Sequence, residues 1–235
     1  MPTDLPPRIR IGSPPYLNAL PLIEDLRKDR NVDLSLVVPS RLSRLMAAGE
    51  FDAALLPSAE YLRKGAYRAV SNAAITCDGD ALSVRLYFRV PPSEIRTVAL
   101  DADSRTSNVL AKIILEKRLL CRPRYRSSAD PLRERAVDAA VVIGDNAFRK
   151  IDLPYLDLGR EWKEWTGLPF VFALWAARRK DRRDWGFLDR AAAEGKRMIP
   201  APIETTYSPI PLGVSSTVLA SATSTPGKVI VVIAP

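Results

Sequence analysis

The chain has 235 residues, of which 47% are hydrophobic and 26% charged, a balance typical of a folded protein rather than a disordered one. It contains no histidine, which excludes imidazole acid–base catalysis, a histidine-containing triad and a histidine-ligated metal site. The net charge of +8 is spread over many short basic stretches, so we expect no nucleic-acid partner but a field that attracts small anions.

Neither a membrane span nor an export signal is indicated. The longest uncharged apolar run, residues 168–177, is much shorter than the roughly 20 residues that a spanning helix needs. The N-terminal sequence MPTDLPPRIRIG lacks the apolar core of a signal peptide. We therefore expect a cytoplasmic protein without a membrane partner. Cys77 and Cys121 are interpreted as buried thiols, and no motif supports a cofactor or a metal.

Strands and helices alternate in the first part of the chain. Short apolar runs predict strands, and stripes with helical spacing predict the helices between them. The predicted strands are 8–11, 33–38 and 52–56, and the predicted helices are 19–29, 41–48 and 58–64. This βαβαβα order predicts a parallel sheet.

The alternation restarts after a longer strand at 81–90 and the break PPSE. The second set comprises a strand at 97–101, a helix at 105–119, a helix at 130–136, a strand at 138–143 and a short helix from about Asn146. FDAALLPSA at 51–59 and VDAAVVIGD at 137–145 hold corresponding places in the two sets. We therefore predict an α/β fold with two similar lobes and a ligand cleft between them.

The predicted division gives lobe I as 1–92 and lobe II as 93–175, with 176–195 returning to lobe I. Strands near 88–95 and 172–180 are expected to connect the lobes. Residues 196–235 are atypical, because they are rich in Pro, Ser and Thr and poor in charge. A divergent end, a disordered tail closed by the strand-like VIVVI, and a shifted reading frame all fit this composition.

Ligands of open parallel sheets bind beyond the carboxyl ends of the strands. This rule selects the loops 12–18, 57–60, 101–107 and 144–146. Their polar residues are Asn18, Ser58, Glu60, Ser104, Arg105, Thr106, Ser107, Asp145 and Asn146. Short hydroxyl and amide side chains predict a site that grips oxygen atoms.

Several of these residues allow a purely structural interpretation. In DADSRTSNVL, the hydroxyls and Arg105 form an anion site at a helix start, or else Ser104 is a cap and Arg105 a solvated charge. Asn18 caps the helix that follows it or serves as a functional amide, and Asp145 is either a base or a cap. Glu60 is interpreted as a first-turn acid that complements the helix dipole.

A resemblance adds to this interpretation. The segments RIGSPPYLNALPLIEDL, FDAALLPSAEYLR, ALDADSRTSNVLAKIIL, DAAVVIGDNAFR and EWKEWTGLPFVFALWAAR together resemble the chorismate dehydratases of the futalosine route to menaquinone. The resemblance implies a periplasmic-binding-protein-like type II fold and conversion of chorismate to 3-[(1-carboxyvinyl)oxy]benzoate. It places the family's functional asparagine on Asn18, the serine of its SV strand on Ser83, and its SRTS hydroxyls on Ser104, Thr106 and Ser107.

The combined prediction is a lyase with chorismate as its small-molecule substrate and Asn18 as the catalytic residue. The predicted substrate-binding residues are Ser58, Ser83, Ser104, Arg105, Thr106, Ser107 and Asp145, with no metal and no cofactor. A non-catalytic protein that binds or senses a small carboxylate is the alternative. Leu82 stands where the family pattern has an arginine beside Ser83, which removes one expected anion contact.

Overall fold

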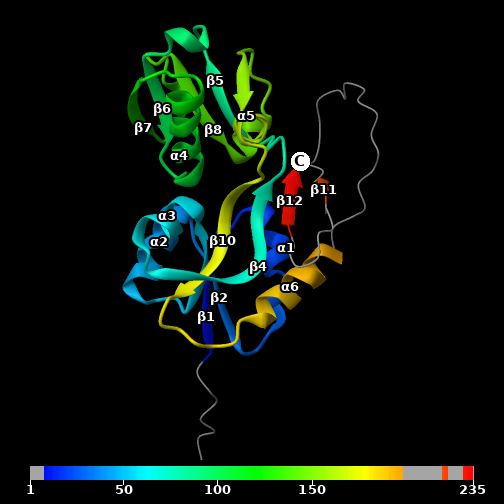
Figure 1. Cartoon of the computed structure of the whole chain (residues 1–235). Coiled ribbons are helices and arrows are strands. Elements are labelled where there is room, and N and C mark those ends of the chain that lie inside the picture. The colour runs from blue at the N-terminus through cyan, green and yellow to red at the C-terminus, as the bar shows by residue number, and fades with distance from the viewer. Residues whose placement is uncertain (1–7, 198–218, 222–229, 235) are drawn as a thin grey trace, which may run out of the picture.

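The computed structural model describes residues 8–197, 219–221 and 230–234. It has two α/β halves, each built on its own sheet (Figure 1). In Figure 1 the first half lies below and the second half lies above. Within the described residues no helix is both long enough and apolar enough to cross a bilayer.

The first sheet contains seven strands in the order β11-β12-β4-β10-β3-β1-β2. Their bounds are β1 Ile9–Ser13, β2 Val32–Leu36, β3 Ala53–Pro57, β4 Tyr67–Cys77, β10 Phe170–Arg178, β11 Leu219–Ser221 and β12 Ile230–Ala234. Strands β2, β1 and β3 are parallel to each other, and β10 runs antiparallel to both β3 and β4. Helices α1 Leu20–Ile23, α2 Pro39–Ala48, α3 Ser58–Lys64 and α6 Gly186–Arg197 belong to this half.

The second sheet has five strands in the order β7-β6-β8-β5-β9. Their bounds are β5 Val84–Phe88, β6 Thr97–Asp101, β7 Arg124–Ser128, β8 Ala139–Ile143 and β9 Tyr155–Asp157. Helix α4 Thr106–Ile113 continues into the π-helical turn η4 Ile114–Arg118, and α5 Leu158–Thr166 follows β9. The expected helix at 130–136 is only a 3-10 turn, η5 Pro131–Arg133.

The chain crosses between the sheets earlier than the expected boundary at residue 92. The strand predicted at 81–90 is β5, which pairs with β8 and β9 in the second sheet. The last strand of the first half before this crossing is instead β4, whose sequence YRAVSNAAITC is rich in small and polar residues and gives little strand signal. The connecting segments are therefore 78–83, between β4 and β5, and 167–169, between α5 and β10, rather than 88–95 and 172–180.

Each half has an apolar core of its own. In the first, Ile11, Leu22 and Trp175 are fully buried in one cluster, while Leu86 and Leu110 are fully buried in the main cluster of the second. Helix α6 packs closely on α1. The two helices are so close that a Cβ atom at Gly195 would lie 1.8 Å from the carbonyl oxygen of Pro21. Residues after the second half thus return to complete the first one.

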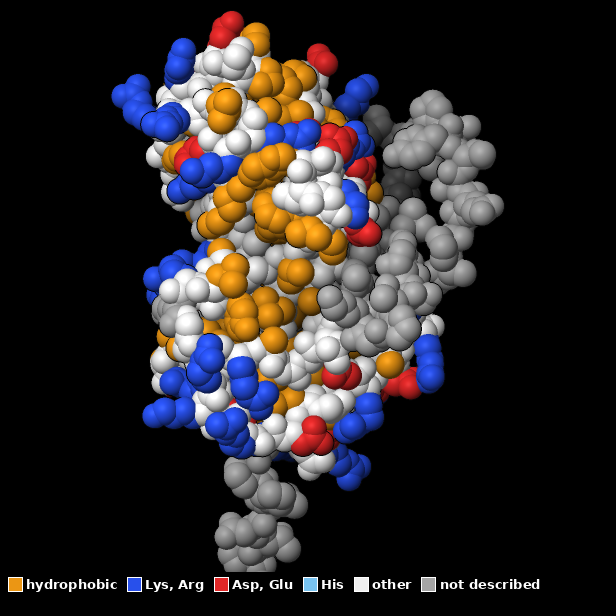
Figure 2. Space-filling model, viewed as in Figure 1, with side chains coloured by type: hydrophobic (Ala, Val, Ile, Leu, Met, Phe, Trp, Pro, Cys, Tyr) orange, Lys and Arg blue, Asp and Glu red, His pale blue; other side chains and the backbone are white. Residues whose placement is uncertain are grey.

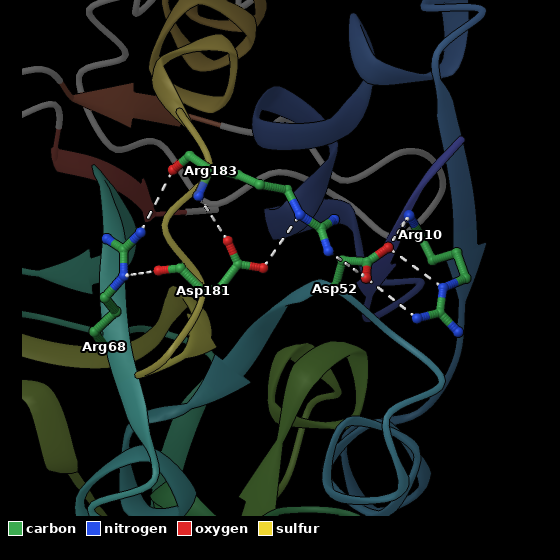
Figure 3. A network of polar contacts seen from close by, with 5 residues as sticks. All are labelled: Arg10, Asp52, Arg68, Asp181 and Arg183. Atoms are coloured by element: carbon green, nitrogen blue, oxygen red, sulfur yellow. Dashed lines mark hydrogen bonds and ion pairs between the residues drawn. The ribbon is translucent and has the colours of Figure 1, made fainter. Parts of the chain in front are cut away.

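A charged network ties this returning segment to the first sheet (Figure 3). The Asp52 carboxylate accepts hydrogen bonds from the backbone and guanidinium of Arg10 and, at 3.0 Å, from Arg183. Arg183 also pairs with Asp181, and Arg68 on β4 donates to the backbone carbonyl of Asp181 at 3.0 Å. Burial opposes ionisation of Asp52, but the hydrogen bonds from Arg10 and Arg183 outweigh it and lower its pKa to about 2.

Replacing Asp52 by Asn tests this network. The folded pKa of about 2 lies below the ordinary value of 3.8, so Asp52 stabilises the fold above pH 4 and loses this effect as the pH falls towards 2. Both arginines are about half exposed, so we expect Asp52→Asn to lower the free energy of unfolding at pH 7 by about 1–2 kcal/mol. Urea denaturation measures this loss, and the exposed Asp152→Asn is the control. Equal stability of the two variants at pH 7 would contradict the assignment.

Candidate active site

The sheet edges that carry the predicted site loops face each other. Strands β1 and β3 end at Ser13 and Pro57, and the pairing of Phe170 with Cys77 places the connecting segments at the same edge. In the second sheet, β6 and β8 are parallel, and Val84 at the start of β5 pairs with Ile143 at the end of β8. All four predicted loops, together with Ser83, therefore lie at the strand ends where the sequence predicted a ligand cleft.

Two of the loops, 57–60 and 101–107, meet across the two halves. The N–H of Ala59 on α3 donates to Thr106 Oγ1 on α4 at 3.3 Å, and Glu60 Oε2 lies 3.9 Å from Arg105 Nη1. Burial raises the pKa of the Tyr16 phenol, and the charges of Asp103 and Asp101 raise it further. Figure 2 shows the surface narrowing where α3 and α4 approach each other.

Asn18 does not act as a helix cap. It lies within the 3-10 turn η1 Leu17–Ala19, and the N-cap position of α1 is Ala19, without a side-chain capping bond. Among the described residues, its Oδ1 atom is buried and has no hydrogen-bond partner. Leaving a buried carbonyl oxygen unpaired costs about 1–3 kcal/mol. The structure therefore contradicts the capping interpretation, and the functional interpretation of Asn18 stays a prediction.

The SRTS loop is also not capped as one interpretation predicted. Arg105, rather than Ser104, holds the N-cap position of α4, and no side chain makes a capping bond there. The three hydroxyl residues Ser104, Thr106 and Ser107 are buried. Asn108, which the sequence analysis missed, fixes the loop by donating from Nδ2 to the backbone carbonyls of Asp101 and Ser104.

Ser83 is positioned by a buried carboxylate that the sequence did not single out. Asp157 accepts hydrogen bonds from the N–H groups of Ala81 at 2.9 Å and Leu82 at 2.6 Å, and it also caps α5. Leu82 is held at a φ of 57°, in the left-handed region that disfavours branched side chains. The Ser83 carbonyl accepts from Gly144 N at 2.9 Å, which brings Ser83 beside the fourth loop.

Ser58 and Asp145 were also predicted to bind the substrate, and the structure describes the side chain of Ser58 only. The Ser58 hydroxyl donates to the carbonyl of Val171 at 2.5 Å, so it ties α3 to the start of β10 and keeps only acceptor capacity for a ligand. Asp145 belongs to the 3-10 turn η6 Gly144–Phe148, but its side chain lies outside the described part of the structure. Its proposed binding role remains a prediction.

Neither cysteine is a candidate nucleophile. Both thiols are free and buried. Burial, followed by the charge of Asp157, raises the pKa of Cys77 to about 12, so its thiol is protonated at neutral pH. Across the described ranges, no three acidic, cysteine or histidine residues are grouped as a metal site requires. The chemistry of the cleft is that of amides, hydroxyls, backbone N–H groups and Arg105.

The comparisons with known proteins agree with this architecture. A solved structure of the protein AF1704 from Archaeoglobus fulgidus superposes with a TM-score of 0.62 at 20% identity, covering 81% of this chain and 76% of the other. The alkanesulfonate-binding protein SsuA from Xanthomonas axonopodis gives a TM-score of 0.51 at 14% identity, covering 83% of this chain and 75% of that one. The fold is therefore periplasmic-binding-protein-like type II, as the sequence predicted.

Sequence comparison identifies the family. The chorismate dehydratase of Thermus thermophilus is 30% identical over an alignment of 192 positions, which covers 73% of this chain and 70% of the relative. The family described as "Menaquinone biosynthesis" matches residues 9–210, a range that contains every loop of the candidate site. The chain belongs to the menaquinone biosynthesis family.

Proposed function

We propose that the chain is a hydro-lyase that converts chorismate to 3-[(1-carboxyvinyl)oxy]benzoate and water in menaquinone biosynthesis. The similarity to a chorismate dehydratase supports chorismate as the substrate. The observation that carries the proposal is the buried Oδ1 of Asn18, which has no partner among the described residues and lies in the turn η1 that follows the end of β1. The futalosine route and a cytoplasmic location, both implied by the family resemblance, are parts of the same proposal.

The reaction asks for positioning more than for strong acid–base groups. Chorismate loses a hydroxyl from one ring carbon and a proton from the neighbouring carbon that bears the enolpyruvyl ether. The C–H electron pair becomes the third ring double bond, and the proton and the hydroxide leave as water. Because an aromatic ring forms, a site that orients the substrate and stabilises developing charge is sufficient.

Asn18 has the atoms for this task. A carboxamide offers one acceptor and two donors, and the acceptor of Asn18 is the atom without a partner among the described residues. In our proposal Oδ1 accepts a hydrogen bond from the ring hydroxyl, while Nδ2 donates to the enolpyruvyl carboxylate. That carboxylate then takes the ring proton, since the chain contains no histidine to do so.

The anionic groups of the substrate match the second half of the cleft. Chorismate carries two carboxylates, and the start of α4 combines a helix dipole with hydroxyls and the guanidinium of Arg105. Ser83, held beside the 144–146 loop, supplies a further hydroxyl. In this proposal Arg105, Ser104 and Ser107 bind the ring carboxylate opposite Asn18.

Turnover of chorismate decides between the lyase and the non-catalytic alternative. Purified protein is incubated with chorismate while absorbance and product mass are followed. A product lighter by one water supports the lyase. Tight binding that leaves chorismate unchanged would contradict it and favour a carboxylate-binding protein, because the fold is compatible with both.

Replacing Asn18 by Ala tests the assigned role directly. Losing a polar group that acts on the reacting centre lowers kcat by about 10²–10³, with no loss of thermal stability, because the amide oxygen has no described partner to lose. Asn31→Ala is the matched control, since Asn31 precedes β2 at the opposite edge of the sheet. Near-normal turnover by a folded Asn18→Ala variant would refute the role.

Asp157→Asn tests whether the buried carboxylate positions Ser83. The amide cannot accept all the backbone N–H groups that the carboxylate accepts, so the 81–83 segment loosens. We expect a loss of about 1–3 kcal/mol in unfolding free energy and a KM for chorismate raised several-fold. Steady-state kinetics at a temperature where the variant is folded separates the two effects. An unchanged KM would show that Asp157 only stabilises the fold.

A further inference from the structure

Helix α3 of the first half begins without a capping side chain of its own. Its N-cap residue is Pro57, which has no side-chain acceptor for the free N–H groups of the first turn. Thr106 of the second half supplies one of these acceptors, since its Oγ1 receives the N–H of Ala59 at 3.3 Å. The first turn of α3 is thus completed across the cleft by the first turn of α4.

This arrangement brings positive charge together. The amino ends of two helices face each other, and each carries a partial positive charge. Arg63 on α3 and Arg105 at the start of α4 add full charges. Without a negative charge between them, these groups would push the two halves apart.

Glu60 supplies that negative charge. Its side chain is only 3% exposed, and its Oε1 lies 2.9 Å from Arg63 Nη2 on the same helix. Its Oε2 lies 3.9 Å from Arg105 Nη1 on the opposite half. The carboxylate therefore stands between the two helix starts with a cation on each side.

We infer that Glu60 is a positioning residue, which holds the start of α4 and its Arg105 against the first half and so presents the second half of the cleft to the substrate. The ion pair engages a single Nη of Arg105 at 3.9 Å, and the guanidinium has five N–H donors. Donors consequently remain for a substrate carboxylate. The kinetic part of this inference rests on the proposed function, whereas the effect on closure of the two halves does not.

Closure is measured first, without substrate. Glu60→Gln keeps the size of the side chain but removes its charge, so we expect a larger radius of gyration in small-angle X-ray scattering. Arg105→Gln, which removes the other partner of this ion pair at a half-exposed site, should increase the radius in the same way. The exposed Glu94→Gln in the second half is the control and should match the wild type. Wild-type dimensions for both Glu60→Gln and Arg105→Gln would overturn the inference.

Kinetics with chorismate tests whether Glu60 acts through Arg105. We expect Glu60→Gln to raise KM about fivefold through loss of its partly exposed ion pair with Arg105, with kcat changed less than about twofold. Glu60→Asp should recover part of the affinity. In the Arg105→Gln background, Glu60→Gln should add no further rise in KM, because the partner is already absent.

Two outcomes would contradict the positioning role. An equal fold increase in KM from Glu60→Gln with and without Arg105 would mean that the residues act independently. A large loss of kcat at unchanged KM would place Glu60 in the chemical step instead. Should the wild type leave chorismate unchanged, the proposed function fails, but the scattering comparison still decides whether Glu60 closes the cleft.

Discussion

The insertion of β10 between β3 and β4 is the constraint on which the rest of the structure depends. Strand β10 arrives from the second half and pairs antiparallel with both neighbours, over Ala173–Ala177 with β3 and Phe170–Arg178 with β4. Until it is in place, β4 has no partner towards the rest of the first sheet. The first half therefore cannot be complete before the second half has folded enough to deliver β10, and such long-range pairing makes folding slow.

The same insertion sets the geometry of the cleft. Because β10 starts at the edge where β3 ends, the connecting segments emerge next to Pro57 and α3. Small side chains permit this close central packing, since Ala173, Ala176 and Ala177 are buried around Trp175. The two functional edges must then face each other, and the opposition of α3 and α4 follows from the sheet pairing rather than from any local preference of those helices.

That opposition explains the distribution of charge in the molecule. Figure 2 shows Lys and Arg side chains spread over both halves on the face in view, without one dominant basic patch. Near the contact of the two halves, the starts of α3 and α4 and the guanidinium of Arg105 contribute positive charge. The buried carboxylate of Glu60 offsets the repulsion between these positive groups. In our proposal, the same positive charge attracts the dianionic substrate. In our proposal, Glu60 therefore links the stability of the closed form to recognition of the substrate.

The sequence was most informative where local pattern and fold agree. The strand at 97–101 and the helix that follows it were predicted because an apolar run and a helical stripe are local signals. The strand-like VIVVI does form β12, which pairs with β4. Most of the remaining residues after 197 lie outside the described part of the structure, so the other interpretations of that segment are not decided.

Elements whose stability comes from distant partners were missed. Strand β4 is rich in alanine and depends on β10, which follows it by nearly one hundred residues. Strand β7 reads RYRSS and is an edge strand with largely exposed side chains, so it shows no alternation. Asp157 escaped for a related reason, because it bonds the N–H groups of Ala81 and Leu82, which only the tertiary fold brings near. Glu60 was interpreted only as a first-turn acid, since its contact with Arg105 also depends on the tertiary fold. Asn108 bonds the nearby carbonyls of Asp101 and Ser104, but a single polar residue carries no periodic signal.

Because the chain contains no histidine, the proposed site has to work mainly by orienting the substrate. Loss of water from a dihydroaromatic ring is driven by aromatisation, so strong acids and bases are less necessary than a fixed orientation of the two leaving groups. A neutral amide on a turn stiffened by Pro14, Pro15 and Pro21 is suited to this, because it does not titrate and its position is set by the backbone. Closure of the cleft then supplies the remaining requirement, which is to bring the anion-binding half to the substrate. In our proposal, catalysis and closure of the two halves therefore depend on the same region, which is formed by the starts of η1, α3 and α4.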